Sequence, residues 1–140
     1  MRARPGRSVH LGVAVDAAEG LLVPVVRGAE RLGVAHMARA IEDLAARARA
    51  KRILPDELAG GTFTLSNPGR RGNLYGAAII NQPQVGILRM GEIVKRPVVL
   101  TENREDRIAI RPMMYLCLSY DHRVVDGAPA NHFLRRVKEI

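Results

Sequence analysis

The order of secondary-structure patterns along this chain predicts an α+β fold. Residues 9–15 and 21–26 are rich in β-branched side chains and flank a turn at 16–20, which is typical of a β-hairpin. Apolar residues then recur at three- and four-residue spacing from 33 to 52, the period of an amphipathic helix. Further strand-like segments follow before a last helix over 127–140. This order differs from regular βαβ alternation and favours the α+β class.

Prolines and glycines set the expected limits of these elements. Pro24 cannot donate a backbone hydrogen bond, so the strand that contains it should lie at a sheet edge or be irregular. The first helix should end before Pro55. Asn67-Pro68-Gly69 forces a turn, and a loop over 70–76 follows it.

The second half of the chain predicts a further hairpin. The remaining strand-like segments are 62–66, 85–100 and 107–119. The middle one should be interrupted near Gly91 and near Pro97. A polar turn over 101–106 joins it to the third segment, so these two segments should pair.

Composition indicates one domain without a metal site. The 140 residues are 47% hydrophobic but only 4% aromatic and contain no Trp, so an aliphatic core is expected. The apolar stretches are too short to span a bilayer, and we expect a cytoplasmic protein without a membrane partner. The single cysteine, Cys117, excludes an internal disulfide and a cysteine-based zinc site.

The charge of the chain raises nucleic acid as a partner. The formal net charge is +8 and the pI is about 10.7. The basic residues are scattered, however, and no aromatic residues stand among them to stack bases. Neither a dinucleotide-binding glycine pattern nor a phosphate-binding loop is present. We therefore expect no nucleic-acid partner, a view that steeply salt-dependent DNA binding would contradict.

The segment from Ser119 to Gly127 carries the candidate chemistry. It lies where a strand is expected to end and the last helix to begin. His122 is a side chain that can take a proton at neutral pH. Asp126 follows four residues later, where it can order the turn, neutralise a nearby arginine or cap the helix. Residue types alone make this a weak signal.

The same segment resembles a known family. Residues 121–127 match the DHRxxDG signature of the dihydrolipoyl acyltransferases, the core components of 2-oxo acid dehydrogenase complexes. Three further segments resemble the family in the same order: 9–27, 61–67 and 79–84. The resemblance covers residues 9–140 and implies the chloramphenicol acetyltransferase-like fold, a two-layer sandwich with a mixed sheet and helices on one face. Residues 1–8 do not resemble the family, so we expect an extension there and an N-terminally incomplete catalytic domain.

The resemblance implies a role for each of three residues. His122 would be the general base that deprotonates the thiol of coenzyme A or, in reverse, of dihydrolipoamide. Ser66 would donate a hydrogen bond to the oxyanion without becoming acylated. Asp126 would hold the architecture of the site through polar contacts. In the family the histidine and the serine meet across a subunit boundary. The resemblance thus implies a homotrimer, with a larger cubic or icosahedral core and the other components of the complex as partners.

Several points stay open at this stage. No lipoyl-bearing or subunit-binding domain is recognisable, so the lipoyl group would come from a separate domain or protein. A catalytically silent relative that scaffolds a dehydrogenase complex is the alternative reading. The acyl group could be acetyl, succinyl or branched-chain. Arg70 and Arg71 could meet coenzyme A phosphates or form a solvated loop, and His10 and His132 are assigned no function.

Overall fold

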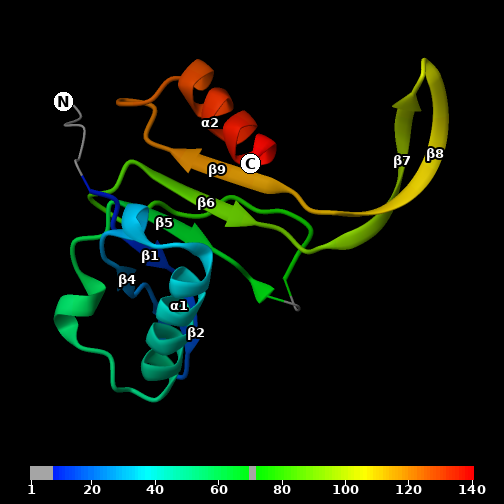
Figure 1. The fold of residues 1–140 in the computed structure, drawn as a ribbon. Coiled ribbons are helices and arrows are strands. Elements are labelled where there is room, and N and C mark those ends of the chain that lie inside the picture. Colours follow the sequence, from blue (N-terminus) through cyan, green and yellow to red (C-terminus); the bar gives the residue numbers. More distant parts are fainter. Residues whose placement is uncertain (1–7, 70–71) are drawn as a thin grey trace.

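The computed structural model describes residues 8–69 and 72–140, and a mixed five-stranded sheet forms its centre (Figure 1). The strand order is β4-β1-β5-β6-β9, with bounds Val25–Val26, Leu11–Val13, Phe63–Ser66, Gly86–Met90 and Leu116–Tyr120. The pairs β1–β5 and β5–β6 are parallel, while β4–β1 and β6–β9 are antiparallel. With two α-helices beside this sheet, the predicted α+β class is confirmed.

The first predicted hairpin is divided between two sheets. Within the predicted hairpin, residues 11–13 form β1 and Val15–Ala17 form β2, after which Gly20–Leu22 form β3 and residues 25–26 form β4. The turn predicted over 16–20 was too long, because only residues 18–19 lie between β2 and β3. The two sheets separate at Ala14, whose N–H donates to the Leu65 carbonyl of the main sheet. Strand β2 then pairs with β3 in a two-stranded sheet. The strand after Pro24 is at the sheet edge, as predicted.

The first helix, α1, spans Val34–Arg49, inside the predicted 33–52. Ala45 and Ala48 of α1 pack with Val15 of β2 in a small buried cluster. Arg47 binds the Glu57 carboxylate of the short 3-10 helix Pro55–Leu58 at 2.6 Å. This ion pair lowers the pKa of Glu57 to about 2 and ties the end of α1 to the segment that leads into β5.

The second predicted hairpin is confirmed, with a shorter turn. Strands β7 (Val94–Glu102) and β8 (Glu105–Met113) form a separate two-stranded ribbon that projects from the body in Figure 1. The turn contains only Asn103 and Arg104, both with positive φ, which suits the twist of a two-residue hairpin. The predicted polar turn over 101–106 was therefore too long.

The prediction of a break near Pro97 was wrong, whereas the break near Gly91 is present. Pro97 pairs with Ile110 inside a continuous β7. In a two-stranded ribbon each strand has one unpaired side, so a residue without an N–H can be accommodated. Strand β6, by contrast, ends at Met90, and β7 begins at Val94.

The last helix, α2, spans Gly127–Glu139 and lies beside β9 (Figure 1). Phe133 of α2 contacts Phe63 of β5, with ring centroids 5.6 Å apart. In the described residues, no helix has the length and apolarity needed to cross a membrane. The extension predicted over residues 1–8 lies almost entirely outside the described residues, because residues 1–7 are not among them.

Two of the family-like segments meet inside the fold. Thr64, in 61–67, donates from its hydroxyl to the Gln84 amide oxygen, in 79–84, at 2.7 Å. Thr64 is 1% exposed and Gln84 is 7% exposed, so water does not compete for this bond. Gly61 leaves room for the pair, because a Cβ there would lie 2.7 Å from the Gln84 amide nitrogen. These segments thus fix the strand that ends at Ser66.

Candidate active site

His122 lies in a tight turn between β9 and α2, where the sequence predicted it. Strand β9 ends at Tyr120, and the Asp121 N–H still donates to the Val85 carbonyl beside it. The Asp121 carbonyl then accepts the N–H groups of Val124 and Val125, both at 3.0 Å. These bonds reverse the chain within a few residues, so the His122 side chain projects from a rigid turn and is 72% exposed.

Asp121 stabilises this turn, a role that the sequence analysis did not assign. Its carboxylate accepts the Arg123 backbone N–H at 3.0 Å and the Arg123 guanidinium at 2.7 and 2.9 Å. The guanidinium lowers the pKa of Asp121 to about 2, and the pKa of Arg123 is raised in turn. The two residues that flank His122 therefore form an ion pair with each other. The spacing of two residues between Asp121 and Arg123 is the feature of the sequence from which this ion pair could have been predicted.

The Asp126 carboxylate lies beside the His122 imidazole. Its Oδ1 lies 3.6 Å from His122 Nδ1, a separation longer than a hydrogen bond. A hydrogen bond from Nδ1–H to this carboxylate would leave Nε2 as the basic nitrogen. The expected cap is corrected: Asp126 occupies the N-cap position of α2, but its side chain makes no capping hydrogen bond. Instead, the carboxylate is near the imidazole.

Ser66 lies at the opposite end of the sheet from His122. It is the last residue of β5 and pairs with Arg89, which pairs in turn with Cys117. Tyr120, three residues after Cys117, pairs instead with Gly86 at the start of β6. Strand rise and spacing therefore separate the Cα atoms of Ser66 and Tyr120 by about 14 Å, and Asp121 continues away from Ser66.

One copy of the chain thus does not bring these two residues to one reacting group. A general base and an oxyanion donor must each lie about 3 Å from neighbouring atoms of the same substrate. We refer to Ser66 and Asn67 as the Ser66 half-site, and to His122 and Asp126 as the His122 half-site.

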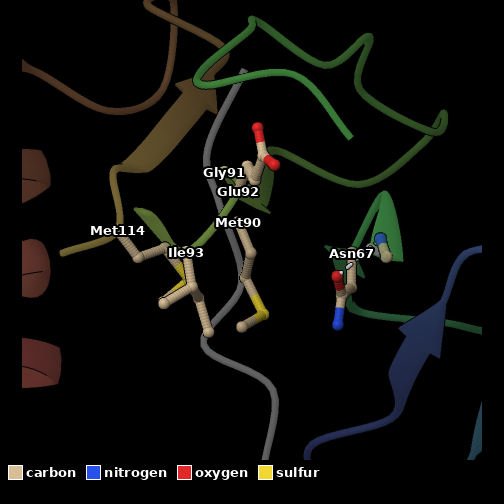
Figure 2. Close-up of a pocket in the computed structure, with 7 residues that line it drawn as sticks. Asn67, Met90, Gly91, Glu92, Ile93 and Met114 are labelled. Carbon is tan, nitrogen blue, oxygen red and sulfur yellow. Dashed lines mark hydrogen bonds between the residues drawn. The ribbon is translucent and has the colours of Figure 1, made fainter. Parts of the chain in front are cut away.

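A cavity of about 300 Å³ adjoins the Ser66 half-site. Figure 2 shows Asn67 on one side and Met90, Ile93 and Met114 on the other, with the Glu92 carboxylate directed away from them. His122 does not line this cavity. The His122 half-site adjoins a separate apolar groove of about 200 Å³ between β9 and α2, whose lining includes Tyr120 and Phe133.

The described residues contain no group of three His, Cys, Asp or Glu side chains that could hold a metal ion. Arg70 and Arg71, which were considered for the phosphates of coenzyme A, lie outside the described residues. The two half-sites present an imidazole, a group that can accept a proton, and a hydroxyl, a group that can donate a hydrogen bond.

Comparison with known proteins identifies the family to which this sheet and its motif-bearing turn belong. The family model for the 2-oxoacid dehydrogenases acyltransferase (catalytic domain) matches residues 4–140, and the chain belongs to this family.

Two curated relatives illustrate the family. The acetyltransferase component of the pyruvate dehydrogenase complex from Corynebacterium glutamicum is 52% identical over 132 residues, which are 94% of this chain and 20% of the relative. The succinyltransferase component of the 2-oxoglutarate dehydrogenase complex from Bacillus subtilis is 49% identical over 130 residues, 93% of this chain and 30% of the relative. The chain thus spans less than a third of their length.

Two solved structures share the fold. The dihydrolipoamide acetyltransferase of Azotobacter vinelandii has a TM-score of 0.87 and 37% identity, over 96% of this chain and 54% of that one. In that enzyme a serine, a histidine and an asparagine have been investigated for their role in the catalytic mechanism, and the last two are four residues apart. The cubic core of a pyruvate dehydrogenase multienzyme complex has a TM-score of 0.88 and 36% identity, over 96% of this chain and 54% of that one.

Proposed function

We propose that this chain carries the acyl-transfer machinery of a dihydrolipoamide acyltransferase, with coenzyme A as a substrate. The observation that supports this most is His122, which projects from a turn braced by Asp121 and Arg123, with Asp126 beside Nδ1. The motif-bearing turn is intact in a chain of this family. The same observation disfavours a silent scaffold, which would not need a braced and exposed histidine.

The chemistry follows from the two half-sites. His122 Nε2 takes the proton of the incoming thiol, either of coenzyme A or of dihydrolipoamide. The thiolate attacks the thioester carbonyl, and the Ser66 hydroxyl donates to the oxyanion that forms. Collapse of this intermediate expels the other thiol, which recovers a proton from His122. In this scheme the enzyme is not acylated. The lipoyl group comes from a separate domain or protein.

The active site would be shared between copies. Because Ser66 and His122 lie at opposite ends of the sheet in one chain, a second copy must supply one of them. We propose a homotrimer, in which each copy gives its Ser66 half-site to one neighbour and its His122 half-site to the other. A related structure is a cubic core, which supports assembly of such trimers into a cubic or icosahedral particle with other dehydrogenase-complex components as partners.

Asp126 would orient His122 and support its positive charge when protonated. The Azotobacter enzyme has an asparagine of mechanistic interest at the same separation from its histidine. An amide and a carboxylate can both accept from Nδ1–H, so either would set the tautomer. The free thiol of Cys117 suits a reducing compartment, and we propose the cytoplasm.

Acyl transfer from acetyl-, succinyl- and isobutyryl-coenzyme A to free dihydrolipoamide tests the proposal and identifies the acyl group. Identities of 52% and 49% to acetyl- and succinyltransferases do not separate these substrates. We expect transfer by the wild type and at least a hundredfold lower kcat for His122→Ala. His132→Ala, an exposed histidine on α2, is the matched control and should retain activity. Solution mass is recorded on the same samples. A trimer without transfer would favour the scaffold.

A further inference from the structure

Arg89 is an unusual residue for its position. It follows buried Ile87 and Leu88 on β6, and its Nε is shielded from solvent. Within residues 8–69 and 72–140, that Nε has no hydrogen-bond partner. A shielded donor without a partner is costly, so such groups usually have a reason to persist.

Arg89 is also the direct neighbour of Ser66. The two residues are register partners in parallel strands, so their Cα atoms lie about 4.8 Å apart and their side chains leave the sheet on the same face. Any segment that packs on the Arg89 side chain therefore also lies on the face of the sheet from which the Ser66 hydroxyl projects.

The guanidinium holds the segment 72–76 against that face. Its Nη2 donates to the Asn73 side-chain oxygen at 2.6 Å. Gly76 lies over it, and a Cβ at Gly76 would be 3.1 Å from Arg89 Nε. The Asn73 carbonyl in turn accepts the Glu92 N–H at 3.1 Å. Asn73 is thus bonded on its side-chain oxygen by Arg89 and on its backbone oxygen by the turn after β6.

The same turn forms a wall of the cavity at the Ser66 half-site. Gly91 and Glu92 line this cavity opposite Asn67 (Figure 2). Gly91 approaches the Leu74 carbonyl so closely that a Cβ would collide with it. Displacement of 72–76 would therefore move both the cover beside Ser66 and the facing wall of the cavity.

We propose that Arg89 is a positioning residue of the Ser66 half-site. It acts through Asn73 on the segment 72–76. This inference rests on the proposed function for its effect on catalysis. Arg89 does not touch the reacting atoms. It fixes the geometry in which the Ser66 hydroxyl meets the oxyanion, a geometry in which an error of about 1 Å is costly.

The test compares Arg89→Met, which keeps the side-chain stem, with Asn73→Ala, at an exposed position where substitutions usually cost little stability. Each should lower kcat for acyl transfer about tenfold or more with little change in KM. The double variant should be no worse than the poorer single variant, since both remove the same contact. Arg89→Lys, which keeps the charge but not the guanidinium fork, should not restore kcat. Arg96→Met removes a comparable bond, to the Tyr115 hydroxyl, and is the control that should leave kcat unchanged.

Amide hydrogen exchange separates this inference from the proposed function. In both variants the Glu92 amide, which is bonded to Asn73, should exchange at least about tenfold faster, whether or not acyl transfer is detected. Unchanged exchange would overturn the inference. So would unchanged kcat with a lowered melting temperature, losses in kcat that multiply in the double variant, or full rescue by Arg89→Lys.

Discussion

The buried bond between Thr64 and Gln84 should be a main stabilising contact of the strand that ends at Ser66. Thr64→Val keeps the shape of the side chain but leaves the Gln84 oxygen buried without its donor. Such an unsatisfied group costs about 1–3 kcal/mol in the free energy of unfolding. Gln84→Leu leaves the Thr64 hydroxyl unpaired and should cost a similar amount. The double variant removes both polar groups and should lose less than the sum of the single changes, by about 1 kcal/mol or more.

Urea unfolding at one fixed protein concentration measures these differences, because assembly would otherwise shift the apparent stability. Thr101→Val is the matched control. It removes a hydroxyl bonded to Asp106 at 2.7 Å, but at an exposed position, so its effect should stay below about 0.5 kcal/mol. If Thr64→Val were as mild as Thr101→Val, or if the single changes were additive, the buried bond would not have the role assigned to it.

Two further changes probe the close contacts around the half-sites. Gly91→Ala should lower the free energy of unfolding by about 1–3 kcal/mol, because the new Cβ would collide with the backbone of Leu74. The control is Gly33→Ala, whose Cβ meets open space and which should cost less than about 1 kcal/mol. Thermal unfolding compares the two variants. Asp121→Asn removes a carboxylate whose pKa Arg123 lowers to about 2. The native state therefore gains stability above the unfolded pKa near 4 and loses it as the pH falls toward 2. The stability gap between wild type and Asp121→Asn should be full at pH 7 and be lost as the pH falls from about 4 through about 2. A gap independent of pH would contradict the ion-pair interpretation.

Local patterns predicted the elements, and long-range contacts decided where they broke. The spacing of apolar residues was sufficient for α1 and α2, since each helix depends on its own periodicity. The break at Ala14 was not predictable, because it depends on a bond to Leu65. Pro97 was expected to interrupt a strand, and only the two-stranded nature of the β7–β8 ribbon makes it acceptable.

The candidate site likewise has one part that local patterns predicted and another that depends on long-range contacts. The strand-to-helix turn at His122 was visible in the sequence, as was Asp126 four residues later. That the Asp126 carboxylate faces the imidazole rather than the helix amides depends on the turn geometry. The separation of Ser66 from His122 follows from the register of β5, β6 and β9, which no local pattern contains. The place of Arg89 beside Ser66 has the same origin.

We propose that the active site combines the Ser66 half-site of one copy with the His122 half-site of another. The most direct test mixes two inactive variants, Ser66→Ala and His122→Ala, by co-expression or by refolding together in equal amounts. If each site takes its two residues from neighbouring copies at random, half the serines and half the histidines are intact. About one quarter of the sites are then complete, so about a quarter of wild-type activity should return. If mixed assemblies form, as native mass measurement can establish, and no activity returns, both residues would have to act within one chain.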